Sequence, residues 1–339
     1  MLRGSASALT RDYDLLILDL DGVVYVGSSA VAGAVESLAE AAQTGARRCF
    51  ATNNASRTPT EVAGHLAELG LPASAEDVIT SSQAAAQLVL ERLGPQASVL
   101  TVGGPGVGAA CDELGLRRVR SADDSPNAVV QGYGRDVGWV DLAEATYAVR
   151  GGAWWVATNT DATLPTERGP APGNGTLVAA VRAAVGVEPV VAGKPEPGLF
   201  LTAATRASAR RPLVVGDRLD TDLAGAVSAG QDGLLVLTGV SRPLDVLEAP
   251  HDQRPVYLAE DLGGLLTAHP EPVPRDGAWS CRDAVVTLVD GRLEGQAPDG
   301  REHSLDLLRA ACAAVWSSRP ARVTVSPELD ARWDPLGRG

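Results

Sequence analysis

The feature that most constrains the fold of this chain is an alternation of short, β-rich apolar runs with stretches of helical pattern. LLILDL precedes the helical VESLAEAAQ, RCFATN precedes PTEVAGHLAELG, and VVAGK, PLVVGD and GLLVLTG each have their own connection. Alternation of this kind predicts a mostly parallel sheet with helices on both faces. We therefore expect an α/β fold built on a Rossmann-like, doubly wound parallel sheet.

A second alternation of the same kind lies within residues 81–186, where SVLTVGG, AVVQG and WWVATN are each followed by a helical stretch. It indicates an inserted α/β domain. After Pro270 the proline-rich HPEPVPRDG is interpreted as a linker, and the tail has the pattern of two strands, a helix and a last strand. We predict a discontinuous core of residues 1–80 and 187–270, an inserted domain of residues 81–186, and a small α+β accessory domain of residues 274–339.

Composition excludes several classes of protein. The chain has 339 residues, 45% of them apolar, but no segment approaches the roughly 18 apolar residues of a membrane span and the N-terminus lacks a signal-peptide pattern, which points to the cytoplasm. The net charge of -13 argues against nucleic acid and anionic membranes as partners. The cysteines lack paired spacing, so we expect reduced thiols and neither a disulfide framework nor a zinc knuckle; they are Cys49, Cys111, Cys281 and Cys312.

Two carboxylates stand where the first strand is expected to end. Asp19 and Asp21 follow LLIL, and Gly22 begins a turn. Ligands of open α/β sheets bind outside the carboxyl ends of the strands. One carboxylate can be a nucleophile and the other can carry a proton, while the glycine lets backbone N–H groups approach a phosphate. Taken alone, the pattern DxDG is also that of an ordinary strand-end turn.

Further carboxylates follow another expected strand. PLVVG ends at Gly216, Asp217 comes directly after it, and Asp222 stands near the start of the next helix. Asp19 and Asp217 could share one hard divalent cation, with waters and a phosphate oxygen completing an octahedron, and this ligand set favours magnesium. Asp222 alone is also explained as an acidic residue in the first turn of a helix.

A polar cluster follows the strand RCFAT. Thr52, Asn53, Asn54 and Ser56 supply a hydroxyl, amides and turn backbone suited to holding phosphate oxygens. The alternative is an N-cap for the following helix, which fits Ser56 or Thr58. That alternative explains Thr52 and Asn53 less well, because both precede the cap.

Lys194 is exceptional in this composition. Of the 29 basic residues, 28 are arginine, and Lys194 in VVAGKPEPG is the one lysine. A compact ammonium group can lie between an aspartate nucleophile and a phosphoryl oxygen as a point charge, where the broader guanidinium fork would fit differently. The alternative is a surface lysine in the turn before Pro195.

Taken in order, DLDGVVYVG, TNNAS, GKPEPG and GDRLDTD resemble the four motifs of the haloacid dehalogenase-like superfamily. The resemblance covers about residues 12–268. It is to the branch with a large C2-type cap between the second and third motifs, which includes NagD-like, 4-nitrophenylphosphatase and phosphoglycolate phosphatases. The resemblance therefore implies a magnesium-dependent phosphatase with a capped α/β core.

The resemblance also implies an aspartyl-phosphate mechanism. Asp19 would attack phosphorus, and Asp21 would protonate the leaving alkoxide and later activate water. Such phosphoryl transfer is catalysed chiefly by positioning and charge neutralisation. The residues implied to hold magnesium are Asp19, the carbonyl of Asp21, Asp217 and, in support, Asp222. The residues implied to bind the phosphoryl group are Gly22, Thr52, Asn53, Asn54 and Lys194.

Three other functions fit the residues less well. Gly104, Gly106 and Ala109, with Asp123 further on, spell a dinucleotide fingerprint, but the chain offers no hydride-transfer constellation. A serine hydrolase is disfavoured because there is no G-x-S-x-G and the four histidines lack metal-ligand spacing. A non-catalytic phosphate sensor on the same fold is the remaining rival, and it is disfavoured because Asp19 and Asp21 are both present.

A large cap that closes over a site excludes water and bulky substrates, so the expected partner is a small phosphorylated metabolite. The segment ATNTDATLPTERGPAPGNGTLVAAV resembles the family's substrate-specificity loop. Turn chemistry explains part of this loop equally well, Asn174 above all. The candidate specificity residues are Asn159, Asp161, Thr166, Arg168 and Asn174.

Within the capped branch, the overall plan resembles actinobacterial glycerol 3-phosphate phosphatases, which also carry an extra C-terminal domain. Glycerol 3-phosphate is therefore the expected substrate. Phosphoglycolate is the alternative, because a substrate carboxylate could use Arg168 or Arg57. The sequence leaves homo-oligomerisation open.

Overall fold

The structure of the chain is a computed structural model. It describes residues 1–164, 168–318, 320, 322–334 and 336. These form two compact units, of which the first joins Met1–Arg48 to Ala207–Gly339 and the second is Cys49–Arg206. The predicted boundaries of core, inserted domain and tail divide the chain more finely and stay predictions.

The first unit contains the parallel sheet that the alternating pattern predicted. Its strands lie in the order β15, β14, β13, β1, and each hydrogen-bonded pair is parallel. All four residues of β1 are buried, as expected for a strand that is covered on both faces. The bounds of the four strands are β1 Leu15–Leu18, β13 Pro212–Gly216, β14 Asp232–Val236 and β15 Tyr257–Ala259.

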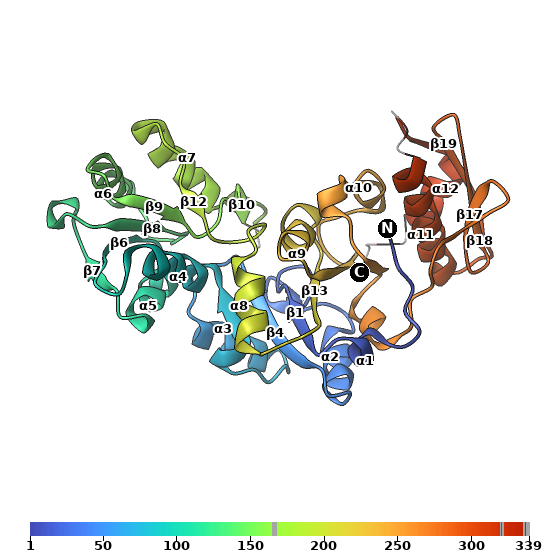
Figure 1. Cartoon of the computed structure of the whole chain (residues 1–339), viewed down its shortest axis with the longest axis horizontal. Coiled ribbons are helices and arrows are strands. Elements are labelled where there is room, and N and C mark those ends of the chain that lie inside the picture. Colours follow the sequence, from blue (N-terminus) through green and yellow to red (C-terminus); the bar gives the residue numbers. More distant parts are fainter. Residues whose placement is uncertain (165–167, 319, 321, 335, 337–339) are drawn as a thin grey trace. The chain divides into compact units, whose positions relative to one another are not determined.

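Short helices and one hairpin complete this part of the first unit (Figure 1). Gly22 and Gly33 adopt positive φ angles, of 86° and 74°, where the chain leaves β1 and enters the next helix. The helices are α1 Leu9–Asp12, α2 Ala34–Ala42, α9 Ala224–Ser228 and α10 Pro243–Leu247, the π-helix η3 Leu219–Leu223, and the 3-10 helices η4 His251–Gln253 and η5 Leu262–Leu266. The hairpin pairs β2 Tyr25–Val26 with β3 Ser29–Ala30.

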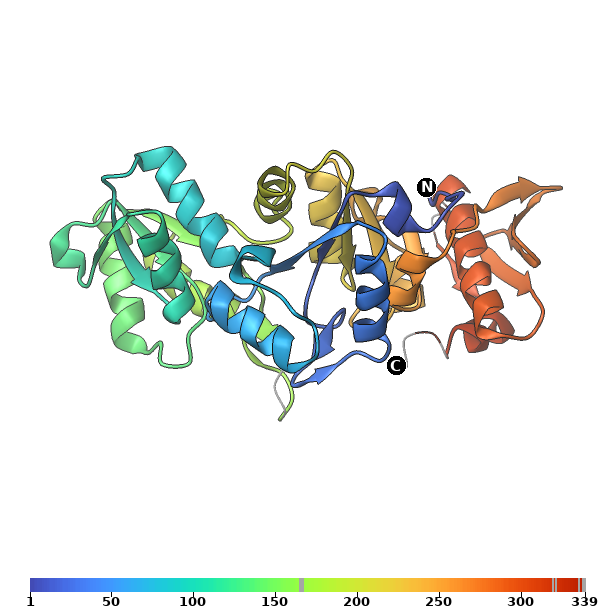
Figure 2. The ribbon, with the colours of Figure 1, turned by 90° about the horizontal axis from the view of Figure 1, so that it is seen from below.

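The tail of the chain forms a five-stranded sheet, β16 to β20 in order, against the long helix α11 (Figure 2). The predicted linker was wrong in part, because Val273–Arg275 within HPEPVPRDG is the edge strand β16. An edge strand tolerates Pro274 because the outer side of such a strand needs no N–H donor. The remaining elements are β17 Ala278–Cys281, β18 Ala284–Val289, β19 Arg292–Gln296, β20 Thr324–Val325, α11 Arg301–Ser318 and α12 Pro327–Trp333.

Helix α11 joins the tail to the parallel sheet. Every residue from Ser304 to Trp316 is buried, and the same hydrophobic cluster contains side chains of α11, β14, β15 and α10. Polar contacts fix the helix: the Arg309 guanidinium pairs with Asp306 at 2.6 Å and donates to the Leu258 carbonyl at 2.6 Å, and Trp316 Nε1 donates to the Leu247 carbonyl at 3.2 Å. Tail and sheet therefore share one core.

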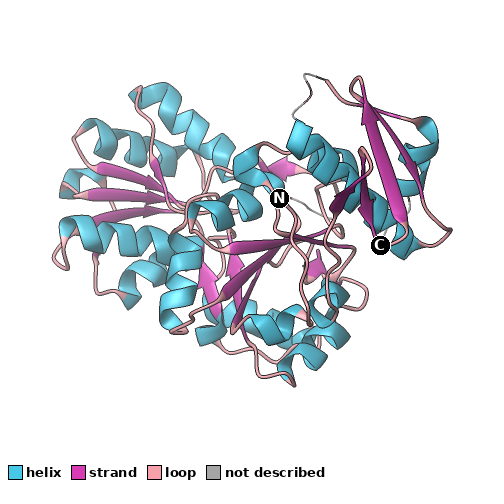
Figure 3. Ribbon diagram, turned by 45° about the vertical axis from the view of Figure 1, so that its right-hand side comes forward, coloured by secondary structure: helices cyan, strands magenta, loops and turns pink. Residues whose placement is uncertain are grey.

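The second unit contains a second parallel sheet, in the order β12, β9, β8, β6, β7. Helices cover both of its faces, as Figure 3 shows, so the predicted second α/β alternation is confirmed. The strands are β6 Ser98–Val102, β7 Arg117–Val119, β8 Ala128–Gln131, β9 Trp154–Ala157 and β12 Val190–Val191. The helices are α4 Ser81–Leu93, α5 Pro105–Glu113, α6 Trp139–Arg150 and α7 Asn174–Val185, with the 3-10 helix η2 Ala122–Asp124.

A smaller parallel pair also belongs mostly to the second unit, where Phe50, Ala51 and Thr52 of one strand face Val78, Ile79 and Thr80 of the other. The helix that follows the first strand has Thr58, one of the two N-cap candidates, as its N-cap, since the Thr58 hydroxyl accepts the Glu61 N–H at 3.2 Å. The elements are β4 Arg47–Thr52, β5 Val78–Thr80, β10 Thr163–Leu164, β11 Ala171–Pro172, α3 Pro59–Glu68, α8 Gly198–Arg206 and the 3-10 helix η1 Ala75–Asp77.

The four cysteines are free and buried. Burial raises the pKa of the Cys49, Cys111 and Cys281 thiols to about 12, which makes them inert near neutral pH. Among the residues that the structure describes, no helix is both long and apolar enough to cross a bilayer.

Candidate active site

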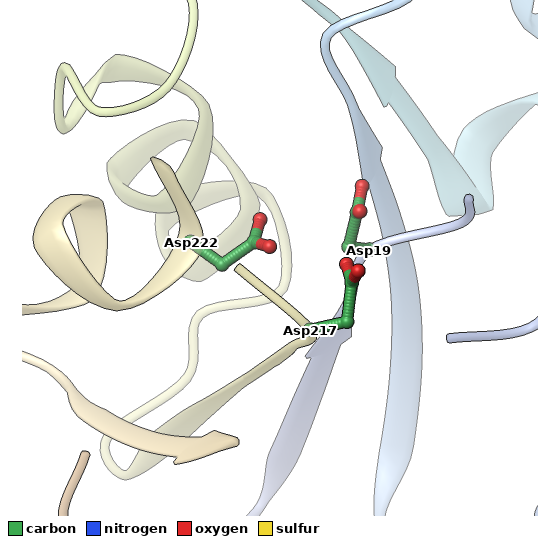
Figure 4. Close-up of side chains that lie close together, drawn as sticks. All are labelled: Asp19, Asp217 and Asp222. Atoms are coloured by element: carbon green, nitrogen blue, oxygen red, sulfur yellow. The ribbon is translucent and has the colours of Figure 1, made fainter. Parts of the chain in front are cut away.

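Asp19 and Asp217 lie side by side at the carboxyl ends of two paired strands. The parallel register joins Leu18 of β1 to Val215 of β13, and the Asp19 N–H donates to the Val215 carbonyl at 2.8 Å. Each aspartate is the first residue after its strand, and Figure 4 shows the two side chains next to each other. The register of the sheet thus brings together two carboxylates that are far apart in the sequence.

Asp222 completes an acidic cluster from the π-helix η3. Asp19, Asp217 and Asp222 each offer one carboxylate oxygen, and these three atoms lie within 4.8 Å of one another. Asp217 is 0% exposed and Asp222 1% exposed. Carboxylates this close repel one another unless a cation neutralises them, and burial strengthens the repulsion. The cluster therefore fits a hard divalent cation held by oxygen ligands.

Asp222 also has the helix-turn role that the sequence left open. The Arg218 N–H donates to its carboxylate at 3.2 Å, so the side chain supports the start of η3. A β-carbon on Gly216 would clash with the Asp222 side chain, which shows how closely this carboxylate packs on the end of β13. The structural role and the place in the acidic cluster are therefore compatible.

The loop of residues 238–241, after β14, orients Asp217. The Val240 N–H donates to Asp217 Oδ2 at 2.7 Å, and the Ser241 N–H donates to the Asp217 carbonyl at 3.1 Å. Gly239 packs on the same carboxylate without room for a β-carbon. Sequence reasoning missed this loop, because it carries no charged residue and nothing in its pattern links it to Asp217.

Asp21 lies in a tight turn whose backbone is fixed on both sides. Asp21 and Tyr25 form an isolated β-bridge, and the Gly22 N–H donates to the Tyr25 carbonyl at 2.8 Å. The Thr238 hydroxyl donates to the Gly22 carbonyl at 2.5 Å. Gly22 has a φ of 86°, a conformation that a residue with a β-carbon rarely adopts. The turn that the sequence predicts at this glycine is therefore present in the structure.

In the second unit, Thr52 ends β4 and its hydroxyl accepts the Asn54 N–H at 3.0 Å. A hydroxyl oxygen that accepts in this way keeps its proton for another partner. Asn54 in turn accepts from both the N–H and the hydroxyl of Ser56, at 3.0 and 2.8 Å. The Asn54 and Ser56 side chains therefore shape the turn.

Thr58, not Ser56, is the N-cap of α3, and hydrogen bonds from its N–H and hydroxyl lower the pKa of Glu61.

Lys194 is buried, with 3% of its surface exposed, so it is not the surface lysine of the alternative interpretation. Its ammonium nitrogen lies 5.9 Å from the centre of the Phe200 ring. The Lys194 N–H donates to Asn53 Oδ1 at 2.9 Å, and Asn53 Nδ2 donates to the Lys194 carbonyl at 3.2 Å. The structure thus brings together Asn53 and Lys194, two of the predicted phosphate-binding residues.

Two of the candidate specificity residues are buried within the second unit. Asn159 Nδ2 donates to the Asn53 carbonyl at 2.7 Å, and Asn174 Nδ2 donates to the Asn159 carbonyl at 2.7 Å. These bonds favour the turn-chemistry interpretation of Asn174, which is 1% exposed. Asn53 Nδ2 donates to Asp161 Oδ2 at 3.3 Å. Arg168 is exposed. Thr166 lies outside the described residues.

The glycine-rich turn that resembled a dinucleotide fingerprint has a packing role. The Gly106 N–H donates to the Ser56 carbonyl at 3.2 Å, and the Gly104 N–H donates to the Tyr133 carbonyl at 2.9 Å. A β-carbon on Gly104 would lie 2.7 Å from the Ser56 carbonyl oxygen. These N–H groups are used within the unit, which removes the basis for a pyrophosphate site at this turn.

A parallel α/β sheet with a cluster of carboxylates at its carboxyl edge indicates an α/β protein that can bind a hard cation outside the ends of its strands. Two family models match the chain: haloacid dehalogenase-like hydrolase over residues 16–117 and HAD-hydrolase-like over residues 191–265. The chain belongs to the haloacid dehalogenase-like hydrolase family.

Individual relatives agree with this assignment. The D-glycerol 3-phosphate phosphatase of Mycobacterium tuberculosis is 45% identical over 329 residues, which cover 94% of this chain and 90% of the relative. The acid sugar phosphatase of Staphylococcus aureus is 36% identical and covers 74% of this chain and 96% of the relative. A crystal structure of the M. tuberculosis glycerol phosphate phosphatase in complex with magnesium superposes with a TM-score of 0.87 at 42% identity, covering 99% of both chains. The resemblance to capped phosphatases of this family is therefore confirmed.

Proposed function

We propose that this chain is a magnesium-dependent phosphatase that hydrolyses glycerol 3-phosphate to glycerol and phosphate. The observation that carries the proposal is the cluster of Asp19, Asp217 and Asp222, whose oxygens lie within 4.8 Å of one another. Support comes from the M. tuberculosis relative, which is named for this substrate, matches nearly the whole chain and was crystallised with magnesium.

The residues present fit a magnesium ion. In the proposal Asp19, Asp217 and the Asp21 carbonyl hold the ion, and Asp222 supports the set from η3. When bound, the ion neutralises negative charge on the phosphoryl oxygens and so favours attack by an anionic nucleophile. Two of the three carboxylates are buried, so the cluster would be costly to maintain without a cation.

The reaction then proceeds in two displacements at phosphorus. An Asp19 carboxylate oxygen forms a bond to phosphorus while the bond to the substrate oxygen breaks, and Asp21 gives a proton to that leaving oxygen. Asp21 next takes a proton from water, and the water oxygen attacks the same phosphorus. The bond between Asp19 and phosphorus then breaks, which frees the Asp19 carboxylate and inorganic phosphate. Gly22, Thr52, Asn53, Asn54 and Lys194 are proposed to bind the phosphoryl group.

The proposed leaving group is small and uncharged, and the Asp161 carboxylate can accept hydrogen bonds from its hydroxyls. The net charge of -13 disfavours polyanionic substrates, while the side-chain amides of Asn159 and Asn174 are bonded to main-chain carbonyls within the unit. A substrate with its own carboxylate, such as phosphoglycolate, remains the alternative, because it could use Arg168 or Arg57, both of which are exposed in the structure.

A phosphate-release screen of a few dozen phosphorylated metabolites with magnesium tests the proposal. We expect glycerol 3-phosphate to give the highest kcat/KM and a chelator to abolish release. A preference for phosphoglycolate would overturn the substrate assignment and keep the reaction. Binding of phosphometabolites without any release would instead indicate a sensor and would overturn the enzyme assignment.

A further inference from the structure

We infer that Asn53 is a positioning residue, which holds the main chain of Lys194 and thereby fixes the ammonium group that binds the phosphoryl oxygen. This inference rests on the phosphate-binding role proposed above for Lys194. It assigns to the Asn53 side chain a task other than direct contact with phosphate.

The Asn53 side chain and Lys194 are joined by a reciprocal pair of hydrogen bonds. The Lys194 N–H donates to Asn53 Oδ1 at 2.9 Å, and Asn53 Nδ2 donates to the Lys194 carbonyl at 3.2 Å. A side-chain amide offers an acceptor and donors in one plane, so it can occupy both main-chain groups of one residue. The strand β12 ends at Val191, so Lys194 lies beyond the sheet ladder that would otherwise supply these partners.

The local packing is built around this pair. A β-carbon on Gly193 would lie 2.5 Å from Asn53 Oδ1, so only glycine lets the amide approach the chain here. Lys194 itself is 3% exposed. Because main-chain groups of a buried residue need partners, removal of the Asn53 amide would leave the N–H and carbonyl of Lys194 without these bonds and the residue would shift.

Asn53 is itself held from two other elements. Its carbonyl accepts the Ser81 hydroxyl of α4 and the Asn159 side chain, both at 2.7 Å. Asn53 Nδ2 also lies 3.3 Å from an Asp161 carboxylate oxygen. Asn53 is therefore held in place by the start of α4 and by Asn159. Because its own position is fixed, its side chain can fix the main chain of Lys194.

A lysine side chain has four rotatable bonds, so its ammonium group is placed well only if its main chain is fixed. Displacement of a charge by about 1 Å at a phosphoryl group is enough to cost about a hundredfold in rate. A residue that fixes the backbone of Lys194 should therefore affect phosphate binding and turnover although it donates nothing to the phosphate from its side chain.

The test is a double-mutant cycle between Asn53→Ala and Lys194→Ala. It is read by kcat/KM for glycerol 3-phosphate and for nitrophenyl phosphate, by the dissociation constant of inorganic phosphate, and by Tm. The matched control is Asn127→Ala, because Asn127 Oδ1 accepts the N–H and hydroxyl of Ser98, both at 2.9 Å, in the same unit. Asn53→Gln keeps an amide but moves it by one methylene, and it replaces Asn53→Ala if the latter does not fold.

We expect Asn53→Ala to lower kcat/KM and weaken phosphate binding by at least about tenfold, and Asn127→Ala to lower only Tm. In the Lys194→Ala background the same Asn53 change should cost less than about threefold, since the group it positions is gone. Equal losses in both backgrounds, or normal kinetics of Asn53→Ala, would overturn the inference while the wild type stays active. A wild type that neither binds nor releases phosphate would overturn the proposed function, and this inference with it.

Discussion

Gly22 and the carboxylate of Asp217 are in direct contact: a β-carbon on Gly22 would lie 2.6 Å from Asp217 Oδ2. Gly22 also has a φ of 86°. We expect Gly22→Ala to displace the Asp217 carboxylate and to lower kcat/KM by at least about tenfold, with an increase in the magnesium concentration needed for half-maximal rate. Steady-state kinetics at several magnesium concentrations measure both effects.

The chain offers a matched control in Gly27, which also has a positive φ, of 62°, but where a β-carbon would meet no atom within 4 Å. Gly27→Ala should therefore cost only the backbone strain, about 1 to 2 kcal/mol of folding stability, and leave magnesium dependence unchanged. If both variants behaved alike, contact with Asp217 would not be the reason for the glycine at position 22.

Asp21→Asn tests the proposed proton donor. An alkoxide leaves poorly without a proton, whereas nitrophenolate leaves readily, so formation of the phosphoenzyme should slow much more with glycerol 3-phosphate than with nitrophenyl phosphate. Rapid-quench measurements of the first turnover compare the two. Equal slowing for both substrates would argue against proton donation by Asp21.

Lys194→Arg tests whether position and size matter as well as charge. Lys194 is 3% exposed, so the broader guanidinium fork must displace its neighbours or the phosphoryl group. We expect kcat/KM to fall at least about tenfold, and Lys194→Gln, which removes the charge, to fall further. Normal kinetics of the arginine variant would show that any cation suffices at this position.

The tail should be integral to the stability of the first unit, because α11 shares its core. Arg309→Leu removes the buried partner of Asp306, which is 0% exposed and keeps a pair with the half-exposed Arg282 at 3.2 Å, and should lower the free energy of unfolding by about 3 kcal/mol. Burial lowers the pKa of the Arg309 guanidinium, and the Asp306 carboxylate opposes that shift. Both effects are expected of an ion pair that is removed from water.

The control for this prediction is Arg301→Leu on the same helix. Arg301 pairs with Glu260 at 3.0 Å, but its side chain is 55% exposed, so its loss should cost less than about 1 kcal/mol. Urea unfolding of the two variants makes the comparison. Equal losses would show that the tail does not depend on the buried pair.

The parts of the site that could be predicted from sequence are those fixed by strand ends. Asp19 and Asp217 each follow a buried apolar run, and parallel strands place such residues at one edge of the sheet. The lone lysine was informative for a different reason, since composition made it exceptional. Local patterns of this kind can be read along the chain without knowledge of tertiary contacts.

The remaining features depend on contacts between distant segments. Val240 N–H reaches Asp217, and the Asn53 amide reaches residue 194, and neither pairing has a local signature. The strand β16 was also missed, because prolines normally argue against a strand and only its place at the sheet edge makes them acceptable. Burial of α11 on all sides likewise follows from its packing between the tail sheet and the core.

In the proposed mechanism the Asp19 carboxylate attacks phosphorus. Asp19→Asn replaces it with an amide, which is a poor nucleophile and a neutral ligand, and should keep the fold. The decisive measurement is phosphate release from glycerol 3-phosphate by this variant at saturating magnesium, compared with the wild-type enzyme. An unchanged Tm shows that the variant is folded. We expect no turnover above background, and a variant that kept more than about a tenth of the wild-type rate would contradict attack by Asp19.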